Sequence, residues 1–199
     1  PSGLLLVDKP KDWTSFDVVA KVRGVLQADL RQKTGERVKL KVGHSGTLDP
    51  QATGLLVLAV GSATKQIDQL MKQDKEYVVD AILGATSETG DSEGPITEQK
   101  EVQPPSKQTV MDVLSRFEGE IEQIPPKYSA IKVDGQRAYK LARAGKEVAL
   151  EPRQVTIHSI SDVTYDWPRL SFTAHVSSGT YIRTLVEDIG SALETGAYM

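Results

Sequence analysis

The chain has 199 residues, with 24 Lys and Arg against 27 Asp and Glu, which gives a formal net charge of −3 at pH 7. Its hydrophobic fraction of 39% and charged fraction of 26% exclude a disordered or collagen-like protein. The absence of cysteine excludes disulfides, thiolate metal sites and a cysteine nucleophile. No apolar run approaches the ~20 residues that a membrane-spanning helix needs, so we expect no membrane association and a cytoplasmic protein.

The first part of the chain alternates short apolar runs with a helical pattern. Gly3–Val7 and Leu55–Val60 have the length and composition of buried strands. Apolar residues at helical spacing follow Thr14 and Ser15, either of which can cap the helix that this pattern predicts. The segment 27–41 is polar and basic and lacks this periodicity, so we expect a loop there.

The second part predicts further strands and two more helices. Tyr77–Leu83 is expected to be a strand, followed by an acidic, turn-rich loop over Gly84–Gly94. Ser106 begins a helical pattern, and a later pair of strands includes the clear alternation of Leu170–Val176. A last helix is expected from Thr180. Strands and helices in this mixed order predict an α+β fold with a mixed, mostly antiparallel sheet flanked by helices.

The Ser-x-x-Lys pattern of some serine hydrolases occurs twice in this chain, so by itself it does not indicate a catalytic site. The two occurrences are Ser62-x-x-Lys65 and Ser129-x-x-Lys132, and the further motifs of a serine–lysine hydrolase are missing. Ser62 is better interpreted as a helix cap. Gly43–Thr47 resembles a nucleophile elbow but ends in threonine where glycine is needed, which argues against a hydrolase.

The three histidines give no metal-site signal in the sequence. His44, His158 and His175 are scattered, without the short paired spacing typical of zinc ligands. His175 falls on the polar face of a predicted strand and is interpreted as a surface residue. A phosphate-binding Gly-x-x-x-x-Gly-Lys loop is also absent from the sequence. We therefore expect neither a metal nor a cofactor.

The most unusual segment is Gly43–Gly54, in which four glycines or prolines surround Asp49. Such a backbone can approach a ligand closely, although an aspartate before proline most often only bonds nearby amides. Arg183 falls in the first turn of the last predicted helix, where the helix dipole disfavours a cation. A carboxylate from another part of the chain would explain an arginine at this position. The alternative is that Arg183 is a surface residue that faces water. Tyr77 is either an aromatic platform for a base or a strand-edge residue.

Basic residues concentrate in two segments despite the net negative charge. The first contains Arg31, Lys33, Arg37, Lys39 and Lys41, and the second contains Lys127, Lys132, Arg137, Lys140, Arg143 and Lys146. A protein with a segregated positive face can bind RNA whatever the sign of its total charge. The alternative for the second segment is a solvated helix face.

In their order along the chain, these features resemble the TruB family of tRNA pseudouridine synthases. The matching segments are Gly3–Pro10, Gly43–Gly54, Lys75–Tyr77, Ile124–Lys132 with Ala142–Gly145, and Ser178–Gly190. The resemblance covers essentially the whole chain. It implies the pseudouridine synthase fold and isomerisation of uridine 55 in the T-loop of tRNA, without metal or cofactor. The N-glycosidic bond breaks and ribose C1′ is rejoined to uracil C5.

The resemblance also implies roles for individual residues. Asp49 would be the catalytic aspartate, Arg183 its salt-bridge partner, and Tyr77 the ring that stacks on the uracil. His44 would lie beneath the displaced nucleotide. Further residues implied to contact the RNA or to belong to the surrounding polar network are Lys21, Asp91, Tyr181, Lys132 and Arg143. The implied partner is the T-arm of tRNA, and we expect a monomer.

The implied chemistry suits these residue types. A carboxylate can attack C1′ or C6, and an adjacent guanidinium would keep it ionised in a buried pocket. The base must be flipped out of its stack, and an aromatic face offsets the lost stacking. A dry pocket would protect the detached sugar from hydrolysis. The sequence leaves the attacked atom open.

The family continues beyond this segment with a Leu-Arg-rich strand and then, usually, an RNA-binding PUA domain. We therefore expect residues 1–199 to be a catalytic domain incomplete at its C-terminus, with weak tRNA binding and little turnover alone. Two alternatives stay open: a guide-RNA-dependent enzyme acting on ribosomal RNA, and a non-catalytic RNA-binding or RNA-folding protein of the same fold. Asp49 together with Arg183 favours an enzyme, because a pure binder needs no such pair.

Overall fold

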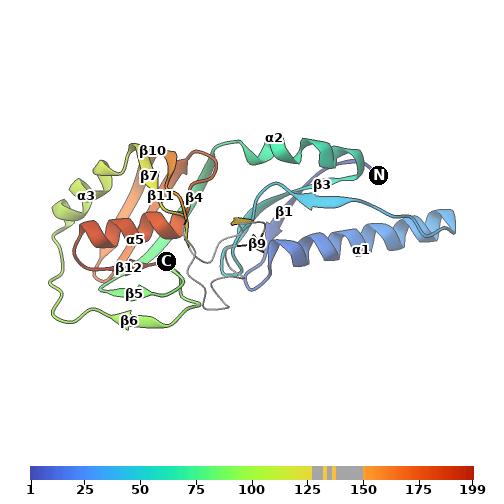
Figure 1. Ribbon diagram of the computed structural model, residues 1–199. Helices are drawn as coiled ribbons and strands as arrows, with labels where there is room; N and C mark the ends of the chain where they lie inside the picture. The colour runs from blue at the N-terminus through green and yellow to red at the C-terminus, as the bar shows by residue number, and fades with distance from the viewer. Residues whose placement is uncertain (127–131, 134–135, 138–149) are drawn as a thin grey trace. The chain divides into compact units, whose positions relative to one another are not determined.

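The computed structural model describes residues 1–126, 132–133, 136–137 and 150–199 (Figure 1). The chain divides into two compact units, Pro1–Gln73 and Asp74–Met199, called here the first and the second unit. The description of residues 1–199 as one incomplete catalytic domain stays a prediction. Among the residues described, no helix has both the length and the apolar character needed to cross a bilayer.

The first unit is a small antiparallel sheet with one long helix. Its elements are β1 (Gly3–Lys9), α1 (Ser15–Thr34), β2 (Val42–His44), β3 (Gly54–Val60), the 3₁₀ helix η1 (Gly61–Gln66) and α2 (Ile67–Met71). The strand order is β1-β3-β2, and both pairings are antiparallel. Val18 and Val19 of α1 pack with Leu56 and Leu58 of β3 to form the core of this unit. The two strands predicted from apolar runs, β1 and β3, are confirmed as strands. The burial expected for Gly3–Val7 is wrong, because β1 is an edge strand and its Leu4, Leu5 and Leu6 are 48%, 41% and 68% exposed.

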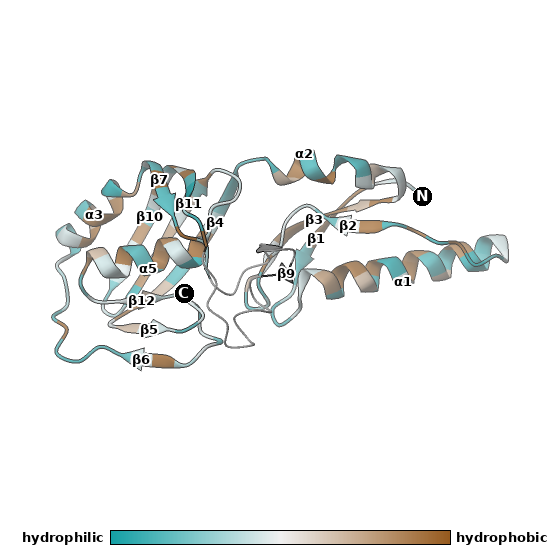
Figure 2. Cartoon of the chain, viewed as in Figure 1, coloured by the Kyte–Doolittle hydropathy of each residue, from teal (hydrophilic) through white to brown (hydrophobic). Residues whose placement is uncertain are grey.

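Local capping determines where α1 begins and ends. Thr14 is the N-cap, and its side chain and that of Asp17 form a reciprocal capping box. Gly35 ends the helix in a left-handed conformation with φ 73° and donates its amide to the Arg31 carbonyl. The expected loop over 27–41 is therefore wrong for residues 27–34, which are helical. Sequence periodicity misses them because this end of α1 is largely exposed and buries no apolar stripe. Figure 2 shows hydrophilic and hydrophobic residues mixed along α1.

The predicted helix cap at Ser62 is wrong. Ser62 lies inside η1, whose N-cap is Val60. The side chain that bonds the first turn comes from Ser2, whose hydroxyl accepts from the Ala63 amide at 3.2 Å. The Ser62 hydroxyl instead lies 2.6 Å from the Ser2 hydroxyl. The helix begins at Gly61, two residues earlier than a cap at Ser62 would give, and Gly61 has a positive φ of 62° that glycine adopts readily.

The described residues of the second unit form a five-stranded antiparallel sheet, two small two-stranded sheets and two helices. Its elements are β4 (Lys75–Leu83), β5 (Ala85–Ser87), β6 (Ile96–Glu98), α3 (Lys107–Arg116), β7 (Gly119–Gln123), β8 (Lys132–Val133), β9 (Gln136–Arg137), β10 (Arg153–Asp166), β11 (Arg169–Val176), α5 (Ile182–Ala192) and β12 (Ala197–Tyr198). The order in the large sheet is β12-β4-β11-β10-β7. All pairings between described strands are antiparallel, which confirms the expected α+β class.

The core of the second unit lies between this sheet and the two helices. The alternation predicted for β11 is confirmed, since Leu170, Phe172, Ala174 and Val176 are at most 1% exposed. The buried faces of α3 and α5 join the same cluster. Ser106 is the N-cap of α3, as expected. The segment expected as a loop over 84–94 begins as strand β5, because it pairs with β6, a partner that a local pattern does not reveal.

Candidate catalytic and RNA-binding residues

The loop around Asp49 connects β2 to β3 in the first unit, and its backbone is tied to the rest of that unit. Leu48 donates its amide to the Ser15 hydroxyl at 2.9 Å, and that hydroxyl lies 3.2 Å from the Leu48 carbonyl. The Ala52 amide donates to the Asp49 carbonyl at 3.0 Å, which closes a tight turn. Ser45 at the start of the loop donates its amide to the Val57 carbonyl of β3. The backbone that carries Asp49 is therefore fixed on both sides.

Lys9 is a buried cation beside this loop, to which the sequence reasoning gave no role. Its side chain donates to three carbonyl oxygens, those of Pro10, Trp13 and Pro50, at 2.9, 2.6 and 3.1 Å. Lys9 is 0% exposed. Burial lowers the pKa of its ammonium group, and the nearby carboxylates of Asp12 and Asp49 partly oppose that shift. One of the three Lys9 hydrogen bonds thus holds the carbonyl of Pro50, the residue that follows Asp49.

His44 and Lys21, two residues of the predicted site, also lie in the first unit. His44 ends β2, and its Nδ1 lies 2.6 Å from the carbonyl oxygen of Gly46. Because a carbonyl only accepts, Nδ1 carries the proton and donates, which leaves Nε2 as an acceptor in the neutral ring. Lys21 of α1 lines a shallow pocket of about 360 Å³ together with Asp12 and Asp17.

Arg183 lies in the first turn of α5 in the second unit, as predicted. It does not face solvent: its side chain is 11% exposed and that of Asp91 is 8% exposed. Arg183 Nη1 is 3.6 Å from Asp91 Oδ2 and donates to the Thr89 carbonyl at 3.0 Å. Asp91 also accepts from the Thr89 hydroxyl at 2.6 Å and from the Glu93 amide at 3.1 Å. A buried guanidinium against a hydrogen-bonded carboxylate is a fixed arrangement, because separating either charge from its partner would be costly.

The two predicted tyrosines lie in the second unit near its core. Tyr77 of β4 is opposite Ala174 of β11 and packs against the hydrophobic cluster. Tyr181 is the N-cap of α5. Its amide donates to Gln123 Oε1 at 3.0 Å and its carbonyl accepts from Gln123 Nε2 at 3.3 Å. Burial raises the pKa of the Tyr181 phenol, whereas Arg153 and Arg183 act in the opposite direction.

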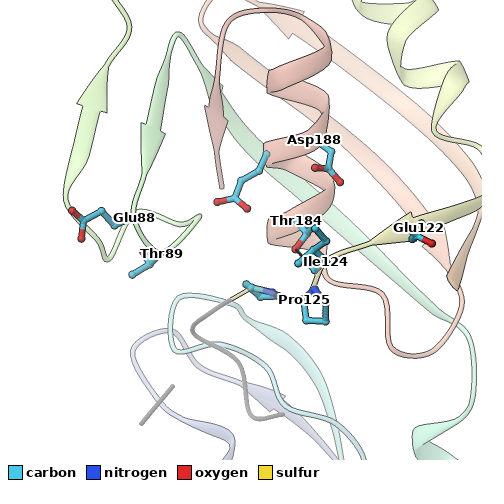
Figure 3. Close-up of a pocket in the computed structure, with 9 residues that line it drawn as sticks. Glu88, Thr89, Glu122, Ile124, Pro125, Thr184 and Asp188 are labelled. Carbon is cyan, nitrogen blue, oxygen red and sulfur yellow. Dashed lines mark hydrogen bonds between the residues drawn. The ribbon is translucent and has the colours of Figure 1, made fainter. Parts of the chain in front are cut away.

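An acidic pocket of about 480 Å³ lies beside the first turns of α5 (Figure 3). It is lined by Glu88, Thr89, Glu122, Ile124, Pro125, Pro126, Thr184, Glu187 and Asp188. Burial, followed by the charge of Asp188, raises the pKa of Glu187, and burial raises that of Asp188. Four carboxyl groups would repel a phosphate, so this pocket is not suited to the RNA backbone. The sequence analysis did not find it, because its lining comes from three separate segments.

The predicted residues are thus divided between the two units. Asp49, His44 and Lys21 belong to the first, whereas Arg183, Asp91, Tyr77 and Tyr181 belong to the second. Of these, the structure brings Arg183 and Asp91 together. The salt bridge between Asp49 and Arg183 stays a prediction. Lys132 lies in the short strand β8, and Arg143 and Ser129 lie outside the described residues.

Comparison with known proteins decides the family. Residues 31–182 match the sequence model of the TruB family pseudouridylate synthase N-terminal domain. The chain belongs to this family. It is 45% identical over 197 residues to tRNA pseudouridine synthase B of Clostridium kluyveri, covering 99% of this chain and 64% of that protein. It is 46% identical to the protein of the same name from Pseudomonas fluorescens, covering 100% of this chain and 61% of that protein.

Solved structures of this fold are similar over nearly the whole chain. A Cbf5-Nop10-Gar1 complex contains a chain with a TM-score of 0.71 and 30% identity, matched over 99% of this chain and 46% of its own length. An H/ACA RNP bound to a substrate RNA containing 2′-deoxyuridine gives a TM-score of 0.68 and 27% identity, with coverages of 99% and 44%. The pseudouridine synthase fold predicted from the sequence is confirmed. The chain spans 61–64% of the length of the two named relatives.

Proposed function

We propose that this chain carries the catalytic residues of a tRNA pseudouridine synthase that isomerises uridine 55 in the T-loop. The observation that carries this proposal is the 45% identity over 99% of the chain to a protein named tRNA pseudouridine synthase B. The immobilised backbone on both sides of Asp49 supports it, because a reacting carboxylate must be held in one geometry.

In the proposed reaction, Asp49 acts on the uridine at C1′ or C6 and allows the C1′–N1 bond to break. The detached uracil turns, a C1′–C5 bond forms, C5 loses its proton and N1 gains one, so no oxidant, metal or second substrate is consumed. Arg183 has the role of keeping Asp49 ionised and oriented in a dry pocket. Asp91 and Thr89 hold this guanidinium by the contacts described above. Arg183 is thus fixed before any RNA binds.

The flipped uridine needs a surface that replaces its lost stacking. Tyr77 is the aromatic residue proposed for this role, and its packing against the core limits the ring to few orientations. His44, Lys21 and Tyr181 are proposed to contact the displaced nucleotide and the T-loop, together with Lys132 and Arg143. We further propose that the protein works as a cytoplasmic monomer with tRNA as its partner; light scattering of the purified protein tests the monomer.

The direct test measures tritium release from tRNA transcript labelled at uracil C5. The full-length protein is expected to release the label, whereas Asp49→Asn is expected to release none while binding tRNA within severalfold of the unmodified protein. Asp68→Asn is the matched control, because it makes the same change at an exposed position of α2. Retained activity in Asp49→Asn would contradict the proposed role of this residue.

Tyr77→Phe separates stacking from a role of the phenol hydroxyl. The ring is kept, so tRNA affinity is expected to remain close to that of the unmodified protein. If the hydroxyl helps to remove the C5 proton, single-turnover rates fall more than affinity. Equal rates in the two proteins would restrict Tyr77 to stacking.

A guide-RNA-dependent enzyme is the second candidate, and the similarity to chains in H/ACA and Cbf5 complexes favours it. The identities to those chains are 27–30%, against 45–46% for the proteins named tRNA pseudouridine synthase B. The same tritium assay separates the two, because a guide-dependent enzyme would release no label from tRNA without a guide RNA. A non-catalytic RNA-binding protein would release none under either condition.

A further inference from the structure

Three side chains of metal-binding type lie together at one end of the large sheet in the second unit. They are Asp74, immediately before β4, His158 in β10 and His175 in β11. One ligand atom from each lies within 4.8 Å of the other two. His158 Nε2 is 3.1 Å from Asp74 Oδ2, and the centroids of the two imidazole rings are 4.8 Å apart. This cluster is distinct from the residues assigned to uridine isomerisation.

Strand register explains why these residues meet although they are far apart in sequence. Val176 of β11 pairs with Lys75 of β4, which places Asp74 just beyond the end where His175 lies. In the pairing of β10 with β11, Ile157 is opposite Val176 and Ser159 is opposite His175. His158 is thus the extra residue of a β-bulge, and a bulge redirects side chains locally. His158 therefore directly precedes the residue opposite His175, which keeps the two imidazoles close across the strand pair.

The ligand set and its spacing suit a divalent transition metal. Two imidazoles and one carboxylate are the three-ligand set of many zinc sites, in which water completes the coordination. Zinc lies roughly 2.0–2.1 Å from nitrogen and oxygen ligands, so tetrahedral neighbours are separated by about 3.3 Å. The His158–Asp74 distance of 3.1 Å is already close to that value. The side chains of Asp74 and His158 are 51% and 35% exposed, so they can turn inward without repacking the core.

The charge of the neighbouring strand favours a cation at this position. Glu76 of β4 is directly opposite His175 in the register, and opposite residues of an antiparallel pair share a face. The carboxylate of Glu76 adds negative charge near that of Asp74. The alternative is that the histidines and Asp74 form only a surface hydrogen-bonded group. That alternative explains the single His158–Asp74 contact, but it gives no reason for the second imidazole.

We propose that Asp74, His158 and His175 form a binding site for one divalent transition-metal cation, with zinc as the probe. The inference goes beyond the proposed isomerase activity, which uses no metal. The site adds a metal-dependent link between the start of β4 and the strands β10 and β11. Metal binding at this site is therefore expected to stabilise the second unit, because a cation that binds only the folded state favours that state.

The test uses the full-length protein without an affinity tag, freed of metal by a chelator and titrated with zinc in competition with a chromophoric chelator. One zinc per chain is expected to bind. His158→Ala and His175→Ala are each expected to weaken binding at least about tenfold, and the double variant to abolish it. Asp74→Asn is expected to weaken binding as well.

Matched controls come from the same chain. His44→Asn alters the remaining histidine, and Asp80→Asn alters an exposed aspartate of the same strand β4; both are expected to bind zinc like the unmodified protein. Circular dichroism verifies that each variant is folded. The absence of zinc binding in the unmodified protein, or equal binding in the double variant, would overturn the proposal. The melting temperature with and without zinc provides a second readout, and a zinc-induced rise that persists in the double variant would also contradict it.

Discussion

In the first unit, the residues around Asp49 are held through their backbone, whereas in the second unit Arg183 is held through its side chain. Lys9 donates to three carbonyls, including that of Pro50, and Ser15 exchanges hydrogen bonds with Leu48. Arg183 is instead fixed by Asp91 and the Thr89 carbonyl. This difference fits the proposed roles, in which the backbone places the carboxylate that reacts and the charge of Asp91 helps to place its guanidinium partner.

The largest effect on this comparison is expected from Lys9→Met. The substitution leaves three partly buried carbonyls without this donor and is expected to destabilise the first unit by about 3 kcal/mol. Trp13 lies in the first unit and Trp167 in the second, so urea unfolding followed by fluorescence in a Trp167→Phe background reports the first unit. Lys11→Met is the exposed control. A change in the free energy of unfolding below about 1 kcal/mol would show that Lys9 does not hold the loop.

An intermediate effect is expected in the second unit from Gln123→Leu. Gln123 is 1% exposed and bonds both the amide and the carbonyl of Tyr181. Leucine leaves the Tyr181 amide at the start of α5 without an acceptor, whereas the Tyr181 carbonyl keeps the Leu185 amide as a donor. The expected loss is about 1–3 kcal/mol. Trp167 fluorescence in a Trp13→Phe background measures it, with the exposed Gln108→Leu as control. Equal free energies of unfolding for the two variants would mean that α5 is positioned by packing alone.

The smallest effect is expected from Glu187→Gln. Burial and the neighbouring Asp188 raise the pKa of Glu187 above its ordinary value of 4.5, so folding favours the protonated form. The ionised carboxylate therefore reduces stability above the folded-state pKa, and this penalty disappears below pH 4.5, where the carboxyl group is protonated in both states. Glu187→Gln is expected to raise the melting temperature slightly at pH 7 and to have no effect at acidic pH. The exposed Glu120→Gln controls for the loss of charge; an equal shift at both pH values would contradict the assignment.

Most regular elements could be predicted because they follow local rules. The apolar runs of β1 and β3, the alternation of β11 and the caps Thr14 and Ser106 each depend on residues close in sequence. The two wrong loop predictions arise where a local rule gives no signal. Residues 27–34 form a helix that packs against little, so they show no apolar period, and β5 forms because β6 pairs with it.

The same distinction between local sequence patterns and long-range contacts applies to the candidate site. The sequence by itself determined the family, the loop around Asp49 and the place of Arg183 at the start of a helix, because these are carried by ordered local motifs. Only the tertiary structure decided that Lys9 is buried beside Pro50, that Arg183 contacts Asp91, and that His158 lies against His175. Such neighbours depend on strand register and on which groups lose water, and both arise from contacts between residues distant in the chain.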